Sequence, residues 1–148
     1  MRQLPQAYEQ HRTDELHYIV REGQDEDIRT MGLTSLSNLE HLLAGGRQLG
    51  RGRVADLFPR LKVDHEPLVV KQVLHGGLFG RLNAEHHRGP DRLLRELAIT
   101  EEARKRGVPV PEVAYMAWTV ARPCRLFMAT VRITASRNLV ELLHNEPP

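Results

Sequence analysis

A lysine in the middle of an apolar segment is the first sign of chemistry in the sequence. Residues 67–74, PLVVKQVL, have the composition of a strand, and alternation along a strand places Lys71 on the face of Val69 and Val73. A charged amine on such a face needs a partner, because burying an unpaired charge is costly. Two interpretations stay open. Either the strand is an edge strand whose lysine extends to water, or Lys71 holds an anion.

A glutamate and two glycines could complete an anion site around Lys71. Glu96 lies beside the apolar stripe of the helix predicted at 90–106, which follows the lysine strand. Gly50 and Gly52 form a turn between two strands that precede the lysine strand. Taken singly, such a turn is typical of a hairpin and such a glutamate is typical of a solvated helix surface. The order of glycine turn, lysine strand and glutamate helix favours one common site.

The elements that must position these residues predict an α+β fold. Ser37 to Glu40 have the form of a capping box, and they predict a short helix that ends at Gly45. Residues 1–36, with one possible short strand at 16–20 (LHYIV), are expected to be an extension that packs weakly or not at all. The later predicted elements are three strands within 47–74, the helix 90–106, strands at 112–120 and 124–133, and a helix from 136. We therefore predict, for residues 37–148, an antiparallel sheet of about five strands packed on one main helix.

The other polar and aromatic residues predict structure rather than chemistry. The main helix is expected to have two i,i+4 ion pairs on its solvent face, Glu101 with Lys105 and Glu102 with Arg106. His86 and His87 are interpreted as surface residues, because no His, Cys or carboxylate spacing favours zinc. The side chains expected to pack in the core or on the sheet are Tyr115, Trp118, Phe127 and Met128.

Composition limits the class of protein. The 148 residues, 41% hydrophobic and 27% charged, fit one globular domain or one half of a two-lobed one. The net charge of +2 is too small to argue for nucleic-acid binding by itself. Cys124 is the single cysteine, so the chain has no internal disulfide and fits a reducing compartment. Neither a signal peptide nor an apolar run of about 18 residues occurs, so we expect a cytoplasmic protein.

The order of these features resembles the nucleotide-binding lobe of protein kinases. In that lobe a glycine-rich loop covers the phosphates of ATP, and a third-strand lysine contacts them while it pairs with a helix glutamate. The residues are also similar to the lipopolysaccharide inner-core sugar kinases, above all the 3-deoxy-D-manno-octulosonic acid (Kdo) kinases. The similarity covers about residues 37–143 and lies in GRGRV, LVVKQVLHGGLFGRL, RELAITEEARKRGVPVPEV and TVRITASRNLVELL.

The resemblance implies ATP as the cofactor and a role for each motif residue. Gly50 and Gly52 would let the backbone approach the phosphates. Lys71 would hold the α- and β-phosphates, and Glu96 would orient Lys71. Backbone groups at the hinge would meet the adenine. The remaining residues that would bind the nucleotide are Val54, Thr130, Val131 and Arg132.

The resemblance also implies a reaction, a metal and an acceptor. The γ-phosphoryl group of ATP would pass, with Mg²⁺, to the Kdo sugar of a lipid A glycolipid on the cytoplasmic face of the inner membrane. Arginines of 51–53 and 76–88 could approach that anionic lipid or form a solvated surface. Kinases take the catalytic aspartate and the metal ligands from a second lobe, and no aspartate follows Ile133. We therefore expect neither magnesium ligands nor phosphoryl transfer from these residues alone.

Two other classes stay open. One is a noncatalytic, kinase-like binding or regulatory module that contacts a protein partner, or another copy of itself, through the face where a second lobe would sit. The other is a small nucleic-acid-binding protein that uses its arginines, although the charge balance predicts no nucleic-acid partner.

Overall fold

A computed structural model describes residues 4–45, 47–48, 54–56, 62–63, 66–74 and 87–133. These residues form an α+β fold with one antiparallel sheet. The helices are α1 (Asp25–Thr30), α2 (Leu36–Gly45) and α4 (Asp91–Lys105). The strands are β1 (Tyr8–Arg12), β2 (Leu16–Arg21), β3 (Arg47–Gln48), β4 (Val54–Asp56), β5 (Lys62–Val63), β6 (Glu66–Val73), β7 (Val113–Thr119) and β8 (Leu126–Val131).

The sheet contains the predicted strands and adds others to them. Its order is β1-β2-β7-β8-β6-β4-β3, and β5 pairs with β6. Five of its eight strands, β3, β4, β6, β7 and β8, are those that the sequence predicts after residue 46. The chain between β4 and β6 contains a further short strand, β5, where Lys62 and Val63 pair with Pro67 and Glu66.

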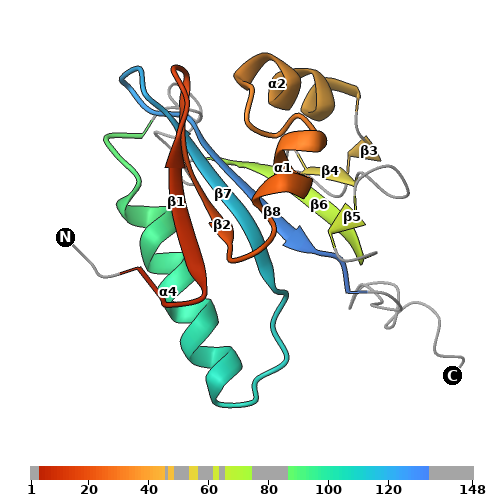
Figure 1. Cartoon of the computed structure of the whole chain (residues 1–148), viewed down its shortest axis with the longest axis vertical. Coiled ribbons are helices and arrows are strands. Elements are labelled where there is room, and N and C mark those ends of the chain that lie inside the picture. Colours follow the sequence, from red (N-terminus) through yellow and green to blue (C-terminus); the bar gives the residue numbers. More distant parts are fainter. Residues whose placement is uncertain are drawn as a thin grey trace, which may run out of the picture.

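The sheet is covered on both faces (Figure 1). We call these the α4 face and the α1/α2 face. Alternation along β6 divides its side chains between the two faces, as expected, because Val73 joins the core of the α4 face and Leu68 and Val70 join the other. The buried residues on the α4 face are Tyr8, Ile19, Val73, Leu93, Leu97, Val113, Met116, Trp118, Cys124, Leu126 and Met128. Those on the α1/α2 face are Leu16, Tyr18, Val20, Ile28, Leu33, Leu39, Leu68, Val70, Ala114, Tyr115, Ala117, Phe127 and Ala129.

Helix α4 forms where the sequence predicts it. Pro90 lies at its N-cap and Arg106 at its C-cap, and Gly107 follows with a φ of +76°. Glycine adopts this left-handed conformation without the steric penalty of a Cβ, which is why the helix ends there. Leu93 and Leu97 are buried and attach the helix to the sheet.

The expected weak packing of the first 36 residues is wrong for residues 4–36. β1 pairs with β2, and β2 pairs with β7, so this segment extends the sheet by two strands. Leu16, Tyr18 and Val20 are fully buried. The physical reason is that β7 would otherwise present an unpaired edge, and β2 satisfies its backbone groups. All the side chains of β7 are consequently buried.

Helix α2 begins earlier than the capping box predicts. It starts at Leu36, and the Leu39 N–H donates to the Ser35 carbonyl. Ser37 therefore lies in the first turn rather than before it. Glu40 forms an ion pair with Arg125, across the α1/α2 face. The helix predicted from 136 lies outside the described residues.

Candidate functional site

The structure brings Lys71 and Glu96 together. Lys71 Nζ on β6 lies 3.2 Å from Glu96 Oε1 on α4. The two side chains are 36% and 37% exposed, so the pair lies at the rim of the α4 face rather than in its core. The lysine therefore neither sits on an edge strand nor lacks a partner: β6 pairs with β4 on one side and β8 on the other.

Local structure explains this position. Met128, opposite Lys71 on β8, is 1% exposed and belongs to the core under α4. Leu97 of α4 is buried in the same core as Met128. Glu96 precedes Leu97 in the helix and lies at the edge of the apolar stripe. A lysine ammonium has three N–H donors and Glu96 accepts from one of them. The half-exposed amine can therefore donate to a second, anionic partner.

The expected phosphate side of the site is described only in part. Val54 lies on β4 directly opposite Lys71 in the register of the two strands. Gly50 and Gly52 lie outside the described residues. The structure thus places one of the predicted nucleotide-binding residues beside the lysine and leaves the two glycines as predictions.

The residues expected to contact adenine lie at the end of β8, where part of their backbone is already paired. Thr130 lies opposite Val69. The Val131 N–H donates to the Glu112 carbonyl at 2.8 Å, and the Arg132 N–H donates to the Pro67 carbonyl at 2.8 Å. Pairing with neighbouring backbone therefore extends through Val131 and Arg132, two of the residues assigned to the hinge, and it uses their N–H groups. The contact of hinge backbone groups with adenine stays a prediction.

A second carboxylate on α4 is buried, contrary to its expected place on the solvent face. Glu101 is 7% exposed, and the Tyr8 hydroxyl donates to its Oε1 at 2.9 Å. Burial raises the pKa of Tyr8 above its ordinary value, and the hydrogen bond to Glu101 raises it further. The other expected helix pair is confirmed, because Arg106 Nη2 lies 2.8 Å from Glu102 Oε1.

Sequence reasoning missed Glu101 although a signal was present. Leu93, Leu97 and Glu101 form one i,i+4 row, which faces one side of a helix. The first two members of the row are buried, and the third follows them into the sheet-facing layer. The charge of Glu101 suggested solvent, whereas its position in the row indicated burial.

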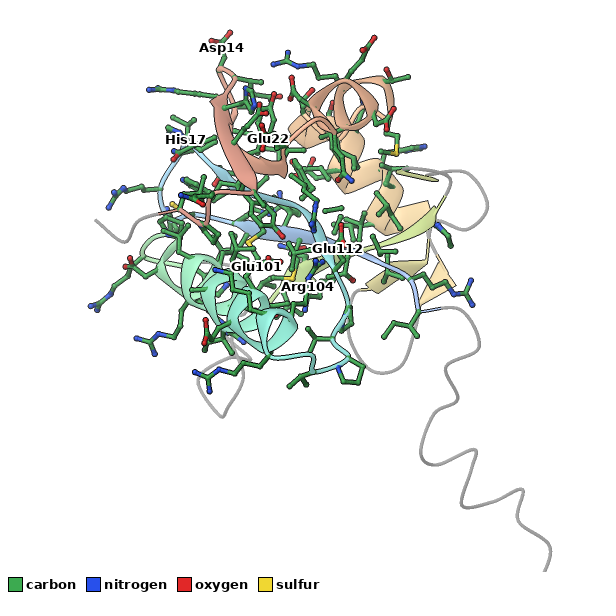
Figure 2. The ribbon with its side chains drawn as sticks, turned by 60° about the horizontal axis from the view of Figure 1, so that its bottom comes forward. Asp14, His17, Glu22, Glu101, Arg104 and Glu112 are labelled. Atoms are coloured by element: carbon green, nitrogen blue, oxygen red, sulfur yellow. The ribbon has the colours of Figure 1, made fainter. Side chains whose placement is uncertain are left out.

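Two arginines extend this polar cluster beside Glu101. Arg104 Nη1 and Arg21 Nη1 each lie 2.7 Å from the carboxylate of Glu112, which precedes β7. Arg104 Nε lies 3.8 Å from Glu101 Oε1. Figure 2 shows Glu101 and Arg104 on α4 close to Glu112. The cluster therefore links β1, β2, α4 and the segment before β7.

The surface interpretation of the histidines is wrong for His87. This residue is 4% exposed, its Nε2 lies 2.9 Å from the Val73 carbonyl, and its backbone pairs with that of Cys124. These contacts attach the segment before α4 to the end of β6. They give His87 a structural role beside the lysine strand. The aromatic residues and Met128 pack in the cores as expected.

The described residues offer no metal centre, since they contain no group of three or more His, Cys, Asp or Glu side chains able to hold an ion. In the same part of the chain, no helix is both long and apolar enough to cross a membrane. Neither a protein-family model nor a curated protein matches the chain, and no solved structure matches it either.

Proposed function

We propose that this chain is the ATP-binding lobe of a kinase, in which Lys71 holds the phosphates and Glu96 orients Lys71. The observation that carries the proposal is the 3.2 Å contact between Lys71 Nζ and Glu96 Oε1. It joins a central strand to the helix that follows that strand. This is the relation between the strand lysine and the helix glutamate in protein kinases.

The strand order supports the same proposal. β3, β4 and β6 are consecutive neighbours in the sheet, so Lys71 stands on the third strand of this group. The segment that joins β3 to β4 contains Gly50 and Gly52. A glycine-containing connection between the first two strands and a lysine on the third is the arrangement that kinases use around the phosphates of ATP.

The electrostatics of the pair suit phosphate binding. The Glu96 carboxylate accepts a hydrogen bond from the Lys71 amine, and exposure of about a third of each side chain limits the cost of removing them from water. A phosphate group on the open side would accept a charge-assisted hydrogen bond from the same amine. ATP fits this donor, whereas Mg²⁺ finds no ligand group among the described residues.

The acceptor comes from the resemblance of the four motif segments to Kdo kinases. On that basis we propose that the complete reaction is transfer of a phosphoryl group to the Kdo sugar of the lipopolysaccharide inner core. The enzyme would then meet its glycolipid at the cytoplasmic face of the inner membrane, as a peripheral protein. The catalytic aspartate and metal ligands of kinases belong to the second lobe, so the property to test in these residues is nucleotide binding.

Calorimetric titration with ATP tests the proposal. Lys71→Met removes the amine but keeps a similar side-chain length, and we expect ATP affinity to fall at least about tenfold, which corresponds to about 1.4 kcal/mol. Lys105→Met is the matched control, because Lys105 is exposed at the end of α4. The ATP affinity of this variant should equal that of the unaltered chain. Equal affinity of the Lys71→Met variant would contradict the role of Lys71. Absence of binding by the folded, unaltered chain would favour a noncatalytic module.

A further inference from the structure

Helix α4 contacts two distant strands through two carboxylates. Glu96 reaches Lys71 on β6, and Glu101 reaches Tyr8 on β1. Three strands, β2, β7 and β8, separate β1 from β6 in the sheet. The helix is therefore attached to two separate parts of the sheet by polar contacts, one from Glu101 within its buried row and one from Glu96 beside that row.

The spacing of these two residues fixes the orientation of the helix. Five residues of α-helix correspond to a rise of about 7.5 Å and a rotation of about 140°. A rotation of α4 about its axis, or a slide along it, would move both carboxylates together. Whatever holds Glu101 in place consequently determines where the Glu96 carboxylate lies.

Burial makes the Glu101 contact sensitive to position. Glu101 and Tyr8 are 7% and 6% exposed, so neither group has water to replace a lost partner. The Tyr8 oxygen also lies 2.9 Å from the carbonyl oxygen of Val113, where β7 begins. One hydroxyl thus connects the N-terminal strand to the helix and to the central part of the sheet.

Packing alone does not require a carboxylate at this position. Leu93 and Leu97 in the same row are fully buried and attach the helix without polar groups. An apolar residue at 101 would continue this row without needing a hydrogen-bond donor at a fixed place. A buried carboxylate accepts only the rotation that meets its donor.

We propose that β1 is a positioning element of the nucleotide site: Tyr8, acting through Glu101, holds α4 in the orientation at which Glu96 meets Lys71. Tyr8 is a positioning residue, since it contacts neither the lysine nor the open side of the pair. The link from Arg21 through Glu112 to Arg104 supports the same orientation from β2. The importance of the orientation for ATP rests on the proposed function, but the orientation itself does not.

The lysine signals in a nuclear magnetic resonance spectrum test this without a nucleotide. The chain has three lysines, Lys62, Lys71 and Lys105, and biosynthetic incorporation of ¹³Cε-labelled lysine reports on each amine while leaving its charge and its N–H donors intact. Glu96→Gln defines the position of the Lys71 signal when the carboxylate is absent. We expect Tyr8→Phe to move the Lys71 signal more than half of the way to that position and to leave the Lys105 signal in place.

Tyr18→Phe is the matched control. The Tyr18 hydroxyl also donates to a carboxylate at 2.9 Å, that of Asp25, but on the α1/α2 face. This variant should leave the Lys71 signal unchanged. A merely structural role for Tyr8 would make the two tyrosine variants alike, and an unmoved Lys71 signal in Tyr8→Phe would overturn the proposal.

Glu101→Gln keeps the proposal testable if Tyr8→Phe does not fold. It retains an acceptor for Tyr8 but removes the charge, so we expect a smaller displacement of the Lys71 signal in the same direction. No displacement in a folded Glu101→Gln variant would overturn the proposal. Failure of ATP to bind would refute the proposed function and leave these lysine signals, and therefore the positioning role, to be judged separately.

Discussion

Two tyrosine–carboxylate pairs lie on opposite faces of the sheet, and they differ in burial. Tyr8 donates to Glu101 on the α4 face and Tyr18 donates to Asp25 on the α1/α2 face, both at 2.9 Å. The Glu101 side chain is 10% exposed, whereas that of Asp25 is 27% exposed. The same tyrosine–carboxylate hydrogen bond therefore forms a buried contact between distant segments at Tyr8 and Glu101. At Tyr18 and Asp25 it forms a more exposed contact between residues close in the sequence.

The difference indicates how the two faces are held. Tyr8 and Glu101 are separated by 93 residues, but Tyr18 and Asp25 by 7. On the α1/α2 face the helices attach mainly through apolar side chains such as Ile28 and Leu39. On the α4 face a smaller set of helix leucines is supplemented by polar contacts that specify orientation. An oriented helix is what a site built from one helix carboxylate and one strand lysine requires.

The largest difference between the pairs should appear in stability. Glu101→Ala leaves the buried Tyr8 hydroxyl without its side-chain acceptor, and we expect the free energy of unfolding to fall by about 1–3 kcal/mol. Glu102→Ala, the adjacent residue on the exposed surface, should change it by less than about 0.5 kcal/mol. Urea unfolding of both variants measures the difference. Equal losses of unfolding free energy in the two variants would mean that the buried contact of Glu101 adds no stability beyond that of an exposed glutamate.

The smaller effect should be a pH dependence at Asp25. Burial would raise the pKa of Asp25, but hydrogen bonds from Arg29 and Tyr18 outweigh it and hold the pKa below its ordinary value of 3.8. A lowered carboxylate pKa stabilises the fold above pH 3.8, and this contribution is lost as the pH falls through the lower, folded-state pKa. Asp25→Asn should therefore be less stable than the unaltered chain at neutral pH.

Thermal unfolding across the acid range checks this sign. The stability difference between Asp25→Asn and the unaltered chain should shrink as the pH falls below 3.8. Asp27→Asn, at an exposed position on the same helix, should show little difference at any pH. A difference for Asp25→Asn that grows on acidification would contradict the assigned pairing.

The sequence predicted the Lys71–Glu96 pair because both residues stand out from their local pattern. A lysine in an apolar strand requires a partner, and the order of elements, with its resemblance to the kinase lobe, indicated that Glu96 beside the apolar stripe supplies it. The main helix and the strands around it were predictable for the same reason, since their apolar periodicity is strong.

Strand β1, the place of the possible strand at 16–20 in the sheet, and the second carboxylate were not predicted, for a different reason. β1 buries only Tyr8, so it lacks the apolar alternation that identifies a strand. Its place depends on β2 and, through β2, on the edge of β7, which no local pattern reveals. Glu101 was misassigned because its partner lies on that undetected strand.

The most direct test of the account is a titration of the chain labelled with ¹³Cε-lysine, whose amines keep their three N–H donors, with ATP, observed at the lysine signals. The account predicts that the Lys71 signal moves in a saturable way while the Lys105 signal stays in place, because a phosphate joins Glu96 as a partner of the Lys71 amine. A Lys71 signal that does not move, or that moves only together with Lys105, would contradict the assignment of Lys71 and Glu96 as a nucleotide site.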